Sequence, residues 1–271
     1  MSTGRADESV APGGAAARTS NDLLVTKGLA KAYGGVHAVT EVSLRVPANS
    51  LTGLIGPNGA GKSTVLGMIA GAIRPDHGSI LLDGEDVTGW PAHRLARRGV
   101  VRTFQAASVF PRMTVLENLV LGAPPWPGER LPSAFIGRRR WRQEERERAE
   151  QARALLDRLD LAASADAFAG ELSGGQKRLV EIGRAIMARP RLLLLDEPMA
   201  GVSRVLAPVI EALIAELRRE GMTVVLIEHE LRVVERLCSL VIVLAQGRVL
   251  MEGEMDELRA DPKVRKAYLV G

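Results

Sequence analysis

Apolar residues form several short runs in this chain. The clearest are residues 192–195, 224–227 and 241–244, and residues 51–55 form a similar run that includes Thr52 and Gly53; each is followed by a polar or glycine-containing segment. Runs of this length without polar alternation are typical of strands that are covered on both faces. In the second half of the chain they are separated by segments of helical character, and this alternation predicts a mostly parallel sheet flanked by helices, an α/β fold.

The N-terminal part has a different pattern. Apolar and polar residues alternate from 23 to 46, with an interruption at Gly34-Gly35, which predicts short, mostly antiparallel strands. A strand and a turn are expected at 79–84. A helix is expected to begin near Lys62 and to end at Gly71, with Pro75 beyond it. An antiparallel β subdomain should therefore precede and adjoin the parallel sheet.

The pattern changes again between residues 106 and 171. Pro, Trp and Arg cluster first, and then Ala152, Leu155, Leu156 and Leu159 occur at helical spacing. We interpret this segment as an inserted helical subdomain. Residues 1–22 are rich in Ser, Gly and Ala and are expected to be a disordered leader, so that residues 23–271 form one domain.

Composition narrows the class of protein. The sequence contains no run of ~18 apolar residues, so no membrane span is expected. A single cysteine excludes an internal disulfide framework and is typical of a reducing compartment. The net charge is +4, but the arginines of 138–148 are interleaved with glutamates, which favours a solvated helix face over a nucleic-acid surface and leaves the role of this segment open.

A glycine-rich loop follows the first of the apolar runs. Residues 56–63 fit the pattern G-x-x-x-x-G-K-[ST], between a predicted strand and a predicted helix. Backbone N–H groups of such a loop and the helix N-terminus bind phosphate oxygens. Lys62 is expected to reach the β- and γ-phosphates of a nucleotide, and Ser63 to ligate Mg²⁺. The candidate cofactor-binding residues are Gly56, Pro57, Asn58, Gly59, Ala60, Gly61, Lys62, Ser63 and Thr64.

Two carboxylates follow the run 192–195. Strands of an open α/β sheet bring their C-terminal ends to the ligand crevice. Asp196 could therefore hold Mg²⁺, directly or through water. Glu197 points the other way and could act as the general base for an attacking water.

Together with these motifs, Leu172-Ser173-Gly174-Gly175-Gln176 makes the sequence resemble an ATP-binding-cassette (ABC) ATPase from about residue 23 to the end. The resemblance implies a P-loop NTPase core and the cofactors ATP and Mg²⁺. It also implies that Ser173, Gly174, Gly175 and Gln176 bind the γ-phosphate of ATP held by an opposing subunit. A helix expected to begin just after Ser173 makes that role physically reasonable.

Three more roles are implied only by the resemblance. Tyr33 corresponds to an aromatic residue that stacks on adenine, with an ordinary core or surface tyrosine as the alternative. Gln105 corresponds to a glutamine that reaches Mg²⁺ or the attacking water, and His229 to a histidine that contacts the γ-phosphate. The catalytic set is thus Glu197, His229 and Gln105, and the metal set is Ser63, Gln105 and Asp196.

The sequence departs from the family at one loop. The family usually has Leu followed by Asp or Asn where this chain has Gly201-Val202-Ser203-Arg204. Communication between two ATP sites is expected to be weaker or asymmetric, without loss of the chemistry.

The resemblance also implies partners. We expect a homo- or heterodimer with a second ABC ATPase, transmembrane permease subunits that dock on 106–150, an extracytoplasmic solute-binding protein acting indirectly, and no nucleic acid. The location implied is the cytoplasmic face of the cell membrane.

Segments such as 34–39, 179–185 and 227–230 resemble importer ATPases for branched-chain or other hydrophobic amino acids. Importers of urea and short amides, exporter subunits and nucleic-acid machines remain alternatives, because no residue touches the solute.

Overall fold

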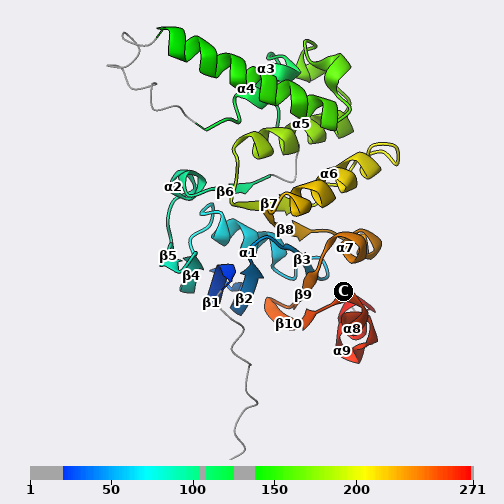
Figure 1. Cartoon of the computed structure of the whole chain (residues 1–271). Coiled ribbons are helices and arrows are strands. Elements are labelled where there is room, and N and C mark those ends of the chain that lie inside the picture. The colour runs from blue at the N-terminus through cyan, green and yellow to red at the C-terminus, as the bar shows by residue number, and fades with distance from the viewer. Residues whose placement is uncertain (1–20, 104–107, 125–137, 270–271) are drawn as a thin grey trace, which may run out of the picture.

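The computed structural model describes residues 21–103, 108–124 and 138–269 (Figure 1). Within them, two sheets lie next to each other and helices cover both faces of the larger one. The strands are β1 (Asp22–Tyr33), β2 (Val36–Pro47), β3 (Leu51–Ile55), β4 (His77–Leu82), β5 (Glu85–Asp86), β6 (Val100–Arg102), β7 (Leu192–Asp196), β8 (Thr223–Ile227), β9 (Leu240–Ala245) and β10 (Arg248–Gly253).

The helices differ widely in length. They are α1 (Lys62–Ile69), α2 (Ala92–Arg97), α3 (Val115–Val120), α4 (Arg138–Arg158), α5 (Gly174–Met187), α6 (Ala207–Arg219), α7 (Leu231–Leu237), α8 (Met255–Ala260) and α9 (Pro262–Leu269). Two 3₁₀ turns, Ala162–Ser164 and Ala169–Glu171, connect α4 to α5. Among the described helices, none is long and apolar enough to cross a bilayer.

The larger sheet has the strand order β10-β9-β3-β8-β7-β6. Its ladders are parallel except for the edge strand β10, which pairs antiparallel with β9. Successive residues of β7 enter different cores: Leu192 and Leu194 pack with α1 and the smaller sheet, whereas Leu193 and Leu195 pack with α5 and α6. Burial on both faces explains why this strand lacks polar alternation, and the predicted α/β class with a mostly parallel sheet is confirmed.

The smaller sheet has the order β2-β1-β4-β5 and is antiparallel throughout. The prediction of short strands here was wrong, since β1 and β2 have 12 residues each. The register of β1 against β2 shifts at several points between Asp22 and Ala32, and both strands continue through these irregularities. Gly34, at φ +58°, and Gly35 form the tight connection between paired residues Tyr33 and Val36.

Helices α3 and α4 lie in the expected insert and pack beside α5 (Figure 1). Ala152, Leu155, Leu156 and Leu159 are buried in the core that also contains Leu193 and Leu195. The helical insert therefore shares one hydrophobic core with the face of the large sheet that α5 and α6 cover.

Candidate functional site

The phosphate loop joins the C-terminal end of β3 to the start of α1. Gly61, immediately before the helix, has φ +98°, and a Cβ there would lie 2.5 Å from the carbonyl oxygen of Ala38. Gly59, at φ +78°, has open space where its Cβ would be. The loop backbone can thus follow a path closed to other residues, and it leaves room for phosphate oxygens next to the helix N-terminus.

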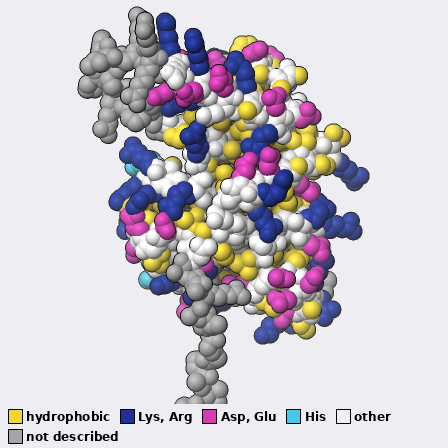
Figure 2. Space-filling model, viewed as in Figure 1, with side chains coloured by type: hydrophobic (Ala, Val, Ile, Leu, Met, Phe, Trp, Pro, Cys, Tyr) yellow, Lys and Arg dark blue, Asp and Glu magenta, His cyan; other side chains and the backbone are white. Residues whose placement is uncertain are grey.

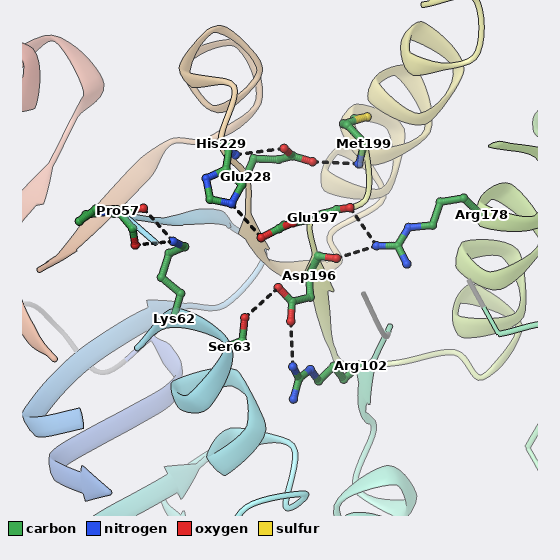
Figure 3. Close-up of polar contacts among 11 residues, drawn as sticks. Pro57, Lys62, Ser63, Arg102, Arg178, Asp196, Glu197, Met199, Glu228 and His229 are labelled. Carbon is green, nitrogen blue, oxygen red and sulfur yellow. Dashed lines mark hydrogen bonds and ion pairs between the residues drawn. The ribbon is translucent and has the colours of Figure 1, made fainter. Parts of the chain in front are cut away.

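Lys62 is folded into this loop. Its Nζ donates to the carbonyl oxygens of Gly56 at 2.7 Å and Pro57 at 3.0 Å (Figure 3). Burial lowers the pKa of the ammonium, although the negative charges of Glu197 and Asp196 act in the opposite direction. A buried ammonium held by two weak acceptors is well suited to exchange them for phosphate oxygens.

Asp196 ends β7 and Ser63 lies in α1, and the two side chains meet at the C-terminal ends of the parallel strands of the larger sheet. The Ser63 hydroxyl lies 3.4 Å from Oδ1 of Asp196, and Oδ2 accepts from Nη2 of Arg102 at 2.8 Å. Asp196 is only 1% exposed. A hydroxyl and a carboxylate are the hard oxygen donors that Mg²⁺ takes together with phosphate oxygens, so this pair fits the metal that the sequence implies.

Glu197 points away from Asp196, toward His229 (Figure 3). Its Oε1 lies 2.8 Å from Nε2 of His229. The backbone at Glu197 is left-handed, with φ +49°, and its N–H donates to the carbonyl of Ile227 in β8. This uncommon conformation turns the two adjacent carboxylates to different partners.

Glu228 joins the loops that carry Glu197 and His229. One carboxylate oxygen accepts from the N–H of Met199 at 2.9 Å, and the other from the N–H of His229 at 3.1 Å. Burial raises the pKa of Glu228, partly offset by these two hydrogen bonds. No local pattern in the sequence identifies Glu228 as part of the site, because nothing in the sequence places Met199 beside it.

Arg178 was missed as well. It is 3% exposed in α5, pairs with Glu181 at 2.7 Å, and donates to the carbonyls of Asp196 at 2.6 Å and Glu197 at 3.0 Å. The guanidinium therefore fixes the backbone of the two site carboxylates. An arginine on the apolar face of an amphipathic helix was the available signal.

The turn at 172–176 is built as a helix start. Ser173 caps α5: its hydroxyl accepts from the N–H of Gln176, and the Gln176 side chain accepts from the N–H of Ser173. A Cβ on Gly174 would meet nothing within 4 Å, whereas one on Gly175 would lie 2.8 Å from Leu206. No hydrogen bond or ion pair of the described residues joins this turn to the phosphate loop of the same chain.

Tyr33 and Gln105 are the remaining residues that the sequence predicts for the site. Tyr33 lies at the end of β1 and is 49% exposed, with Nζ of Lys31 5.7 Å from its ring centre. Its stacking role stays a prediction. Gln105 lies outside the described residues.

A strand, a glycine loop with its lysine, and a serine-aspartate pair at the C-terminal ends of the parallel strands define a nucleotide-binding P-loop protein. The family model for the ABC transporter matches residues 39–200. The chain belongs to the ABC transporter family and is an ABC-type ATPase.

Known relatives are similar over nearly their whole length. The high-affinity branched-chain amino acid transport ATP-binding protein BraF of Pseudomonas aeruginosa is 41% identical, with 92% of this chain and 98% of BraF covered. The lipopolysaccharide export system ATP-binding protein LptB of Haemophilus influenzae is 36% identical, with 91% and 97% covered. The crystal structure of an ADP-bound cassette of an ABC transporter matches with a TM-score of 0.78 at 37% identity, covering 92% of this chain and 99% of the other.

Proposed function

We propose that this chain is the ATP-hydrolysing subunit of a membrane ABC importer for branched-chain or other hydrophobic amino acids. The observation that carries the proposal is the full-length similarity to BraF, in a chain that also has each described part of the phosphate site. On this proposal the chain acts at the cytoplasmic face of the membrane.

The chemistry follows from the contacts in the site. Lys62 exchanges the carbonyls of Gly56 and Pro57 for phosphate oxygens. Ser63 and Asp196 would hold Mg²⁺, which would neutralise charge that develops on the phosphates. Glu197 accepts a proton from the attacking water, and His229, hydrogen-bonded to it, orients the carboxylate and contacts the γ-phosphate. We propose Gln105 as a further contact to water or metal and Tyr33 as the adenine platform.

A second ATPase subunit completes the site. The turn at Ser173 and Gly174 is exposed and presents the start of α5 to the phosphates of a nucleotide bound by the opposing subunit. ATP then stabilises the closed dimer, and hydrolysis removes that preference. Val202 and Ser203, close to Gly175, replace the family's usual residues in the loop that crosses the dimer.

The permease subunits need a docking surface. A groove of about 480 Å³ runs between β6 and α5 and is lined by Phe110 and Leu121, two exposed apolar residues of the 106–150 segment. We propose that a cytoplasmic helix of the membrane partner docks there. The docked helix would then lie next to Arg102, which contacts Asp196 of the proposed metal site. The solute-binding protein would act through the permeases, and no nucleic acid takes part.

The similarity to LptB favours a second candidate, an export system. An uptake experiment separates the two. Deletion of the coding sequence should abolish uptake of radiolabelled leucine, isoleucine and valine, with restoration by the wild type but not by Glu197→Gln. Normal amino acid uptake in the deletion strain would refute the importer proposal, and selective loss of urea or amide uptake would redirect it to those solutes.

A further inference from the structure

Both oxygens of Asp196 have partners in this structure. Oδ2 accepts from Nη2 of Arg102 at 2.8 Å, and Oδ1 lies 3.4 Å from the Ser63 hydroxyl (Figure 3). The side chains of Asp196 and Arg102 are 2% and 16% exposed. A largely buried carboxylate that is a candidate metal ligand is thus neutralised by an arginine of the same chain.

The two cations cannot share this carboxylate without cost. Arg102 does not lose its proton in a protein, so its charge can only be moved, not removed. Mg²⁺ carries two charges and has to approach the same carboxylate. Repulsion between guanidinium and metal is strong at such a buried position because water screens it poorly.

The guanidinium of Arg102 also does not use all of its hydrogen-bond donors in this position. Within the described part of the chain its Nε is buried and has no hydrogen-bond partner. Nη1 is packed close to α1, since a Cβ on Gly67 would be 3.2 Å from it. Arg102 also lines the groove of about 480 Å³ together with Thr103 and Ser108, so the side chain borders space into which it can move.

We propose that the Arg102 guanidinium occupies the place of Mg²⁺ beside Asp196 in the nucleotide-free protein and moves into the groove when Mg²⁺ and nucleotide bind. The inference rests on the proposed function, which assigns Ser63 and Asp196 to the metal. Its consequence is that Arg102 sets the Mg²⁺ concentration that nucleotide binding requires.

The test is the Mg²⁺ dependence of binding of a fluorescent ADP, measured without turnover. In Arg102→Gln, the free Mg²⁺ concentration that gives half of the Mg²⁺-dependent change in ADP binding should fall about tenfold, which corresponds to ~1.4 kcal/mol. Arg102→Lys, which keeps the charge, should stay near the wild type. Arg191→Gln is the matched control, because it removes the same charge from an arginine that pairs with Asp83. Arg191 immediately precedes β7, so it lies at the opposite end of this strand from Asp196. An unchanged or higher Mg²⁺ requirement in Arg102→Gln would overturn the inference.

Failure of the metal assignment gives a different result. If the wild type binds the fluorescent ADP independently of Mg²⁺, or if Asp196→Asn keeps the wild-type dependence, the assignment of Asp196 fails and the inference fails with it. If both behave as expected and only Arg102→Gln does not shift downward, only the inference fails.

A measurement on the wild type avoids any folding defect of the variants. The guanidinium NMR signal of Arg102, assigned by its loss in Arg102→Lys, should move when Mg²⁺ is added to the ADP complex. An unmoved signal at saturating Mg²⁺ would contradict the exchange.

Discussion

Replacement of Glu197 by glutamine should separate ATP binding from hydrolysis in this site. The amide has nearly the same volume and keeps one oxygen near Nε2 of His229, which lies 2.8 Å from the carboxylate in the wild type. What is lost is a group that can take a proton from water. General-base catalysis contributes roughly 10²- to 10⁴-fold, so kcat should fall by that factor, or ~2.7–5.4 kcal/mol in the barrier.

Binding of Mg²⁺·ATP should persist and become tighter, because a negative charge close to Lys62 and the phosphates is removed. The assays are phosphate release, titration with a fluorescent ATP, and size-exclusion chromatography, in which the closed dimer should accumulate. Glu216→Gln, a half-exposed glutamate of α6 paired with Arg158, serves as the control and should leave all three unchanged. A kcat within a factor of two of the wild type would show that Glu197 is not the base.

Three further predictions concern the loop, the buried arginine and the buried glutamate. Gly61→Ala should abolish nucleotide binding in titrations while the protein stays folded, because its Cβ would lie 2.5 Å from the Ala38 carbonyl; normal binding would contradict the loop geometry. Arg178→Met removes the buried cation paired with Glu181 and should cost about 3–5 kcal/mol in urea unfolding, with a loss below ~1 kcal/mol arguing against the pair's role. For Glu228, burial raises the folded-state pKa, so its stabilising contribution is complete below the unfolded value near 4.5 and is lost as pH rises through the folded pKa. Relative to Glu228→Gln, the wild type should therefore lose unfolding free energy as pH increases from about 4.5; a pH-independent difference would refute this.

Local sequence patterns predicted the parts of the site that depend on neighbouring residues. The loop at 56–63 follows β3 directly and the pair Asp196-Glu197 lies at the C-terminal end of β7, so pattern and geometry coincide. The same holds for Ser173, since a capping serine followed by Gln176 predicts a helix start.

Contacts between distant strands could not be predicted in this way. Arg102 meets Asp196 because β6 and β7 are neighbours in the sheet, although 94 positions separate the two residues. Glu228 meets Met199 through the adjacent ends of β7 and β8. Strand order is a property of the whole chain, so no local window contains it. The lengths of β1 and β2 were underestimated because register irregularities are not visible in the alternation of apolar residues.

In the proposed dimer, one ATP is held by the phosphate loop of one subunit and the turn at Ser173 of the other. Lys62→Ala and Ser173→Arg should each be nearly inactive as ATPases when assayed alone. In mixed dimers one site carries both lesions and the other carries neither, so combining the two inactive variants in equal amounts should restore a substantial part of the wild-type activity. If the mixture stays as inactive as its components while the wild type hydrolyses ATP, the turn at Ser173 does not serve the opposing subunit's nucleotide.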